Sequence, residues 1–273
     1  MNKRILGNQG QFGDLCINTV AFKKTKELYP DDFLIMSINK KYSEIAPIFF
    51  NNPYIDSLII WDQYDKWPNE KDLSLIRKNK NTTIYHPMPP HTNDAWFLNS
   101  HQTEECAFMN GYNGDRFPNG EQCILTKWFD VNKNLNYVAF SPFAGFYSPD
   151  NKKMLSIEKA QEIVNFIKSN GYNIIQLGGP NEPTLDGAIK ENCSFFSSIK
   201  TALSCKFYIG TDTGMTWILS AYSHPTLGLY SHEYYTKDYV KNIQPINPNA
   251  IYLSEINVNQ ITIEKIEESI KNF

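Results

Sequence analysis

The chain has 273 residues, of which 41% are hydrophobic and 14% aromatic, so it can fill one large or two ordinary domains and is too apolar to be disordered. Its 26 basic and 29 acidic residues give a net charge of -3, which excludes the overall positive charge typical of nucleic-acid-binding proteins. The five cysteines form no CxxC pair and no zinc-finger spacing, which argues against a structural zinc site and a disulfide framework. No segment approaches the ~20 apolar residues that cross a bilayer, and the first residues lack a signal-peptide core, so we expect a cytoplasmic protein.

The first half of the chain alternates strand-like and helix-like segments. In order, the pattern predicts a strand at 3–6, a helix at about 14–28, a strand at 33–38, a short helix at 43–52, a strand at 57–61, a helix at 72–79 and a strand at 82–87. Pro30 ends the first of these helices. This β-α-β-α order predicts a parallel sheet that is covered on both faces.

The same alternation restarts in the second half. It predicts a strand at 137–143, a helix between the N-cap Ser156 and Asn170, a strand at 173–179, a helical segment at 195–204, a strand at 206–210, a helix after it, a strand at 225–231 and a last helix at about 262–272. The polar stretch 126–136 reads as an exposed connection. We therefore predict one domain at 1–130 and another at 131–273, each binding ligands beyond the carboxyl ends of its strands, in a cleft between two facing sheets.

Two loops that follow strands carry groups suited to ligands. The first, "GNQGQFGD" at 7–14, places Asp14 at a helix start, where the alternative is an ordinary helix-capping aspartate. The second follows the strand at 137–143 and carries Lys152 and Lys153 just before a helix cap. A lysine ammonium beside free amides suits a phosphate, whereas the alternative for this pair is a solvated surface run.

Two later loops complete the set. "LGGPNEP" at 177–183 has a Gly-Gly turn that allows a nucleoside to lie against the backbone, with Glu182 accepting from ribose hydroxyls, although an ordinary turn explains it nearly as well. "GTDTG" at 210–214 joins a strand to a helix. The first amides of a helix lack internal partners and its dipole favours negative charge, so this junction predicts an anion site.

Taken together and in this order, these motifs resemble the ADP-heptose:lipopolysaccharide heptosyltransferase-like family, glycosyltransferase family 9. The resemblance rests on Gly13-Asp14 at the first helix, "NPYID" at 52–56, "LGGPNE" at 177–182 and "GTDTG" with the apolar helix that follows. It covers most of the chain and is weak between about 65 and 130. It implies a GT-B fold, with two facing Rossmann-like domains that have parallel sheets, the first on the acceptor side and the second binding the donor.

The resemblance also implies an activity. Members of the family it resembles are inverting glycosyltransferases that need no metal ion and no cofactor. By this resemblance, the chain would move a sugar from a nucleotide-sugar such as ADP-heptose to a saccharide or glycolipid acceptor in lipopolysaccharide biosynthesis. A heptose is one candidate for the sugar. No nucleic acid is implied, and any membrane contact is expected to be transient.

Residue roles follow from the same resemblance. Asp14 becomes the general base for the acceptor hydroxyl, and Lys153, with Lys152 as the less favoured neighbour, would contact the donor diphosphate. The implied donor-binding residues are Ser148, Lys153, Gly178, Gly179, Glu182, Asp212, Thr213, Gly214 and Trp217. The expected acceptor-binding residues are Gly13, His91, Asp94 and His101. For each histidine the alternative is a solvated or packed side chain.

One position departs from the family pattern. Trp217 stands where members commonly have histidine, and an indole offers one N–H donor and a large apolar face that can stack on a sugar. Two other functions stay open. One is a non-catalytic nucleotide-sugar or glycan-binding protein, and the other is a sugar-nucleotide epimerase or hydrolase of the same fold.

Overall fold

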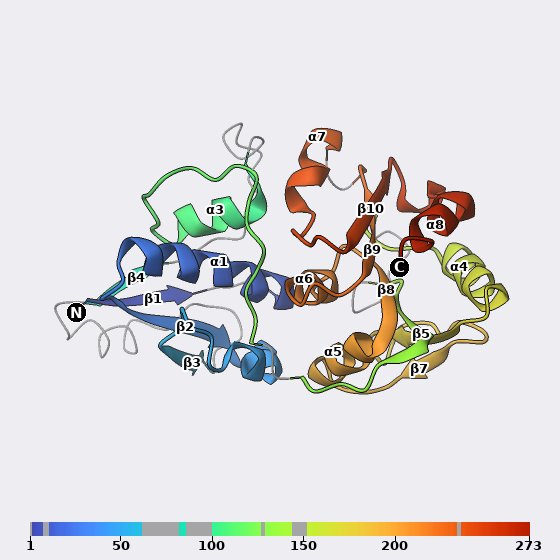
Figure 1. Ribbon diagram of the computed structural model, residues 1–273, viewed down its shortest axis with the longest axis horizontal. Helices are drawn as coiled ribbons and strands as arrows, with labels where there is room; N and C mark the ends of the chain where they lie inside the picture. The colour runs from blue at the N-terminus through green and yellow to red at the C-terminus, as the bar shows by residue number, and fades with distance from the viewer. Residues whose placement is uncertain are drawn as a thin grey trace. The chain divides into compact units, whose positions relative to one another are not determined.

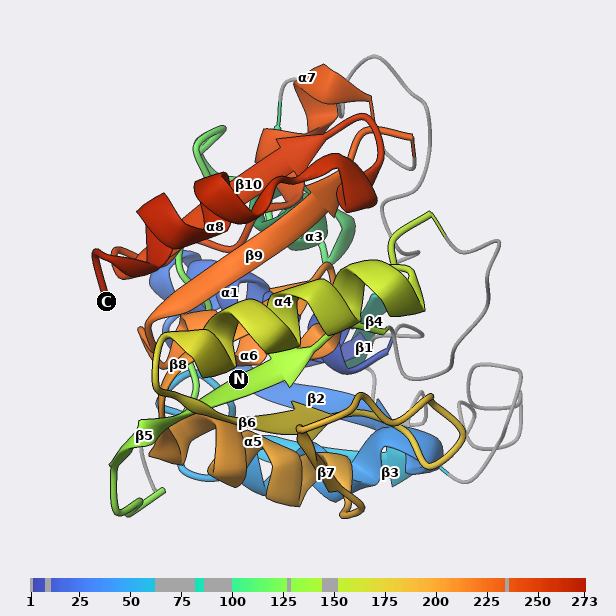
Figure 2. The same ribbon diagram turned by 90° about the vertical axis from the view of Figure 1, so that its right-hand side faces the viewer.

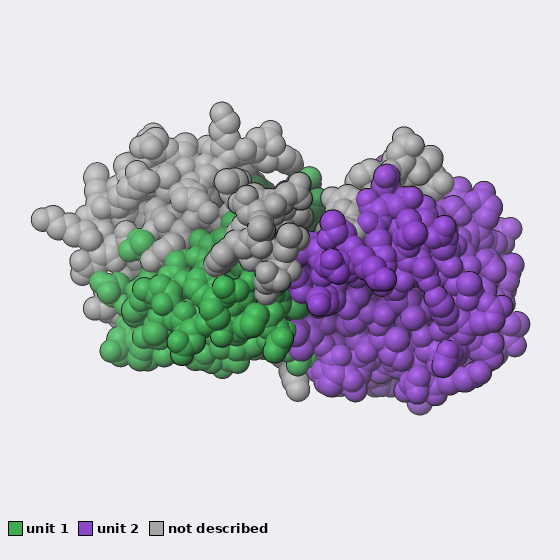
Figure 3. All heavy atoms as spheres, turned by 90° about the horizontal axis from the view of Figure 1, so that it is seen from above, with its two compact units in different colours: residues 1–128 green, residues 129–273 purple. Residues whose placement is uncertain are grey.

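The computed structural model of the chain describes residues 2–7, 11–61, 82–85, 100–126, 129–143, 152–233 and 236–273. The chain forms two compact units, residues 1–128 and 129–273, which are green and purple in Figure 3. Their boundary falls slightly before the one expected after residue 130. The expected helix at 72–79 lies outside the described residues.

The first unit is built on a parallel sheet with strand order β3-β2-β1-β4 (Figure 1). Its strands are β1 (Lys3–Gly7), β2 (Phe33–Asn39), β3 (Ser57–Trp61) and β4 (Thr82–Tyr85). Its described helices are α1 (Phe12–Leu28), the 3-10 helix η1 (Lys40–Phe49) and α3 (Gln102–Met109). The short helix expected at 43–52 is thus a 3-10 helix that starts earlier, and Pro47 inside it has no N–H to donate to a regular α-helical ladder.

The second unit is built on a six-stranded parallel sheet with order β10-β9-β8-β5-β6-β7. Its strands are β5 (Asn134–Ser141), β6 (Asn173–Leu177), β7 (Ile189–Glu191), β8 (Cys205–Thr211), β9 (Thr226–Ser231) and β10 (Ala250–Glu255). Its helices are α4 (Ile157–Ser169), α5 (Phe195–Ser204), α6 (Gly214–Ala221), α7 (Lys237–Val240), η3 (Lys241–Ile243), η4 (Val258–Gln260) and α8 (Ile263–Ile270).

Read from β7, this order is the doubly wound Rossmann arrangement, which changes direction between β5 and β8. The first unit changes direction in the same way between β1 and β4. In open α/β sheets, ligands bind at such switch points, beyond the carboxyl ends of the strands. We therefore expect a ligand to bind at the loop after β1 in the first unit and at the loops after β5 and β8 in the second.

The apolar core of the second unit lies on one face of its sheet. Figure 2 shows α4 and α8 over this face, where Ile163 of α4 and Ile266 of α8 pack with Phe207 and Leu229. Ser156 caps α4 as expected, since its Oγ accepts from the Lys159 amide at 3.1 Å. No helix among the described residues is both long and apolar enough to traverse a bilayer.

A buried histidine precedes β9. His224 is 3% exposed, and the Lys133 ammonium lies 3.5 Å from its Nδ1. Burial first, and then the positive charge of Lys133, lower the pKa of His224 from 6.5 to about 3. The imidazole is therefore neutral in the folded protein throughout the physiological pH range.

This histidine should make stability fall with acidification. The unfolded chain takes up the proton near pH 6.5 and the folded chain only near pH 3, so the stability present above pH 6.5 is lost as the pH falls through this window. We expect the free energy of unfolding to drop by about 1.4 kcal/mol per pH unit from this group. Urea unfolding at pH 7 and pH 5 should show a smaller drop in His224→Gln than in wild type, whereas the control His232→Gln should behave like wild type. Equal drops in all three proteins would contradict this assignment.

Candidate functional site

An ion pair joins the loops after β5 and β8 at the switch point of the second unit. Lys153 Nζ lies 2.8 Å from Asp212 Oδ2, and the two side chains are 21% and 11% exposed. The strands that carry the two loops are hydrogen-bonded neighbours, with Ser141 at the end of β5 opposite Gly210 of β8. Two residues expected at the donor site, far apart in sequence, are thus brought together at the carboxyl edge of the sheet.

Helix α6 begins directly beside this pair. Thr213 is its N-cap residue, in extended conformation, but its hydroxyl makes no capping hydrogen bond to the described backbone. Thr216 in the first turn instead donates to the carbonyl of Thr211 at 2.8 Å. The first amides of α6 therefore keep the capacity to bind an anion, and the lysine adds a positive charge at the same place.

Tyrosine rings leave no room for a side chain at two glycine positions in this part of the sheet. A Cβ on Gly210 would lie 1.9 Å from Tyr208 Oη, and a Cβ on Gly228 would lie 2.6 Å from the Tyr252 ring. The two glycines are paired in register on β8 and β9. The first glycine of "GTDTG" is therefore required by packing inside the unit.

The loop after β6 holds a buried carboxylate. Glu182 is 3% exposed, and its amide donates to the carbonyl of Gly179 at 3.2 Å. A Cβ on Gly178 would lie 1.7 Å from Glu182 Oε2, so the carboxylate folds back over this glycine. Lys190 donates to the backbone carbonyl of Glu182 and so holds the loop. A contact between Glu182 and a ribose stays a prediction.

In the first unit, Asp14 lies in the first turn of α1, next to Gly13. Its Oδ2 accepts from the Gln11 amide at 2.7 Å, so the aspartate does cap its helix. Helices α1 and α3 lie side by side (Figure 1). One turn after Asp14, they are joined by a hydrogen bond in which Cys106 Sγ of α3 donates to Asn18 Oδ1 of α1 at 2.8 Å. Burial first, and then the negative charge of Asp14, raise the pKa of the Cys106 thiol. The role of Asp14 as a base stays a prediction.

His101 has a structural position at the start of α3. The residue is 4% exposed, and Nδ1 accepts from the Thr103 amide at 3.2 Å, as an N-cap does. A Cβ on Gly120 would lie 2.2 Å from the same nitrogen, so the next loop is packed on the ring. Of the two alternatives stated for this histidine, the structure shows the packed side chain, and its contact with an acceptor stays a prediction.

Glu104, in the first turn of α3, anchors the loop that follows the helix. Its carboxylate pairs with Arg116 at 2.6 Å and accepts from the Phe117 amide at 2.6 Å. Burial raises the pKa of Glu104, but the hydrogen bonds from Arg116, Ser100 and Phe117 outweigh it and lower the pKa below its ordinary value. The expected site residues Ser148, His91 and Asp94 lie outside the described residues.

Trp217 is buried in α6. It is 4% exposed, and its amide donates to the carbonyl of Thr213 at 3.4 Å within the first turn of the helix. Its proposed stacking on a donor sugar stays a prediction. Among the described residues, no group of three or more His, Cys, Asp and Glu side chains is arranged to hold a metal ion.

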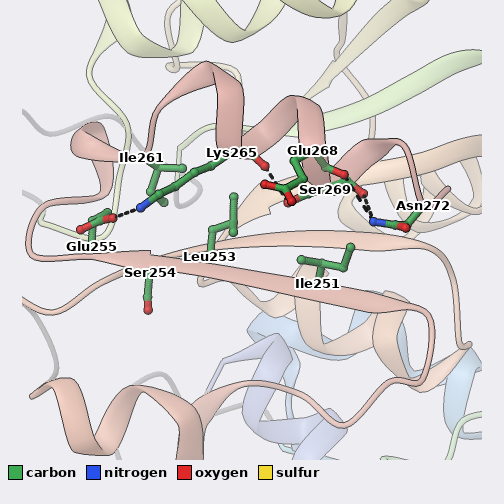
Figure 4. Close-up of a pocket in the computed structure, with 9 residues that line it drawn as sticks. All are labelled: Ile251, Leu253, Ser254, Glu255, Ile261, Lys265, Glu268, Ser269 and Asn272. Atoms are coloured by element: carbon green, nitrogen blue, oxygen red, sulfur yellow. Dashed lines mark hydrogen bonds and ion pairs between the residues drawn. The ribbon is translucent and has the colours of Figure 1, made fainter.

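A cavity of about 360 Å³ lies elsewhere in the second unit, between the edge strand β10 and α8 (Figure 4). Ile251 and Leu253 point from the strand toward the helix, and Lys265 pairs with Glu255 at one end. At the other end, Asn272 donates to the carbonyl of Glu268 at 3.3 Å. None of the residues expected to bind a ligand lines this cavity.

The contact between Gly178 and Glu182 predicts a specific mutational effect. Gly178→Ala should lower the free energy of unfolding by about 1–3 kcal/mol, because the new methyl group overlaps the carboxylate and forces it to move. The same substitution in a Glu182→Ala background should cost much less, because the overlapping atoms are gone. Urea unfolding of the four proteins measures this coupling, and an equal cost in both backgrounds would refute the contact.

No family model matches the sequence, and no match was found among curated proteins. The fold does match solved structures. A glycosyltransferase family 9 protein from Veillonella parvula DSM 2008 has a TM-score of 0.68 at 14% identity, over 99% of this chain and 96% of that chain. The E. coli ADP-heptose lps heptosyltransferase II has a TM-score of 0.72 at 12% identity, over 99% and 98%. The E. coli heptosyltransferase WaaC with ADP has a TM-score of 0.69 at 12% identity, over 99% and 100%.

These matches span nearly the whole length of both partners in each comparison. They confirm the predicted α/β fold class, with a parallel sheet in each of two Rossmann-like units. For the fold, they also confirm the resemblance to the heptosyltransferase-like family that the motifs indicated. The chain therefore has the GT-B fold of glycosyltransferase family 9 and the ADP-heptose heptosyltransferases.

Proposed function

We propose that this chain is a glycosyltransferase that moves a sugar from a nucleotide-sugar to a saccharide or glycolipid acceptor, with inversion and without a metal ion. The observation that carries the proposal is the Lys153–Asp212 pair at the start of α6, at the switch point of the second unit. A lysine beside free helix amides suits a diphosphate, which is the leaving group of a nucleotide-sugar. ADP, which the WaaC structure contains, is the first nucleotide to test.

The proposed reaction divides between the two units. In the first, the Asp14 carboxylate takes the proton of an acceptor hydroxyl, and the oxygen then attacks the anomeric carbon. The bond from that carbon to the phosphate oxygen breaks, and its electron pair leaves with the nucleoside diphosphate. In the second, Lys153 and the first amides of α6 stabilise the negative charge that develops on the leaving group. A single displacement of this kind inverts the anomeric centre.

Lysine substitutions test the donor side of the proposal. Lys153→Ala should weaken ADP binding about 10-fold to 100-fold, because a charge-assisted hydrogen bond contributes about 1.5–3 kcal/mol. Its matched control is Lys152→Ala, an exposed neighbour that should bind ADP far better than Lys153→Ala. Calorimetric titration measures the affinities, with GDP and UDP beside ADP to identify the nucleotide. Equal losses in the two variants, or no binding of any nucleotide by wild type, would contradict the proposed donor site.

Substitution of Asp14 tests the chemistry separately from binding. Asp14→Ala should keep the affinity for the nucleotide and lower kcat about 10²-fold to 10⁴-fold, the contribution typical of a general base. The measurement is release of nucleoside diphosphate from a panel of nucleotide-sugars, with and without acceptor extract. Release that does not depend on acceptor would favour a hydrolase, and binding without any turnover would favour a non-catalytic binding protein.

A further inference from the structure

Three tyrosines line the face of the second sheet opposite its main apolar core. Tyr208 of β8 and Tyr230 of β9 are 0% and 1% exposed, and Tyr252 of β10 packs edge-on against Tyr230 with ring centroids 5.8 Å apart. Strand alternation places all three on the same face, because the core residues Phe207 and Leu229 occupy the other. The hydroxyls of Tyr208 and Tyr230 are therefore shielded from water and need a partner within the protein.

Two of these hydroxyls have partners, and the third has none among the described residues. Tyr252 Oη donates to the carbonyl of Pro245 at 2.6 Å, and Tyr208 Oη lies 3.4 Å from Thr216 Oγ1. The hydroxyl of Tyr230 has no hydrogen-bond partner in the described part of the chain. A buried hydroxyl without a partner is unfavourable, and phenylalanine would fill the same space without that cost. The hydroxyl therefore calls for an explanation beyond packing in the free protein.

Asp212 follows β8, the strand beside that of Tyr230. Thr211, the last residue of β8, pairs with Leu229 of β9, so Asp212, the first residue after β8, follows at the level of Tyr230. Burial first, and then the negative charge of Asp212, raise the pKa of Tyr230, as a carboxylate close to the phenol would. Asp212 is engaged by Lys153 at 2.8 Å in this structure. The carboxylate that pairs with Lys153 is thus also close enough to act on the phenol of Tyr230 through its charge.

We propose that Tyr230 is a positioning residue, which donates a hydrogen bond to Asp212 when a bound phosphate draws Lys153 away. This inference rests on the proposed donor site. The diphosphate competes with Asp212 for the lysine ammonium, and a carboxylate only 11% exposed then loses a donor that water does not readily replace. The Tyr230 hydroxyl takes over, so the loop at the start of α6 keeps its conformation while Lys153 binds the ligand.

A test that needs no ligand removes the lysine by mutation. Tyr230→Phe alone should leave the unfolding midpoint unchanged or raise it, because it removes an unpaired hydroxyl. In a Lys153→Met background, where Asp212 has lost the lysine, the same substitution should lower the midpoint by about 2–4 °C. The control Tyr252→Phe loses an existing hydrogen bond and should lower the midpoint equally in both backgrounds. Equal effects of Tyr230→Phe in the two backgrounds would overturn the proposal.

A binding measurement then tests the exchange of donors directly. Tyr230→Phe should weaken ADP binding about 3-fold to 10-fold although it does not destabilise the free protein, whereas Tyr252→Phe should keep the wild-type affinity. Undiminished ADP affinity in Tyr230→Phe would overturn the exchange even if the stability coupling is present. Failure of wild type to bind any nucleotide would refute the proposed donor site, while the ligand-free cycle would still decide whether Tyr230 supports Asp212.

Discussion

The ion pair between Lys153 and Asp212 is the contact on which the second unit's site depends. Each residue follows a different strand, and the pair forms only because β5 and β8 are neighbours that run parallel and end at the same edge. That edge is the switch point of a doubly wound sheet, where loops diverge to opposite faces and leave room for a ligand. The pair is partly exposed, so an incoming anion can compete for the lysine.

Packing beneath this pair limits what the surrounding residues can be. Tyrosine rings cross the paired glycines Gly210 and Gly228, and the Glu182 carboxylate folds over Gly178. These glycines are fixed by contacts inside the unit, which differs from the usual explanation of glycine-rich loops as places where a ligand approaches the backbone. Within "GTDTG", Gly210 thus serves the packing, whereas Asp212 and the start of α6 are placed to meet a ligand.

Local patterns were sufficient to predict most of the described framework. The Ser156 cap, the helix that it starts and the last helix of the chain follow from signals a few residues apart, and the structure confirms them. The edge strand β10 escaped prediction because all its residues are only partly buried, which weakens the alternation that marks a strand. The pattern gave no bounds for the helix α3, because its first turn is buried yet polar, with Thr103, Glu104 and Glu105.

The site was harder to predict than the framework, because its contacts are long-range. The motifs indicated Lys153 and Asp212 separately, but their pairing depends on strand order, which no single motif encodes. His101 was expected at the acceptor site because an imidazole can bind hydroxyls. That expectation did not include its place as an N-cap, where its ring nitrogen already accepts from the Thr103 amide. Tyr230 gave no signal at all, since its significance comes from a buried hydroxyl without a partner in the described part of the chain and from the carboxylate that follows the neighbouring strand.

A crystal structure of the protein with ADP would test the central claim most directly. The account predicts the diphosphate at the start of α6, with Lys153 Nζ within hydrogen-bonding distance of a phosphate oxygen and Tyr230 Oη within hydrogen-bonding distance of Asp212. ADP bound elsewhere, with the Lys153–Asp212 pair still at 2.8 Å, would contradict it.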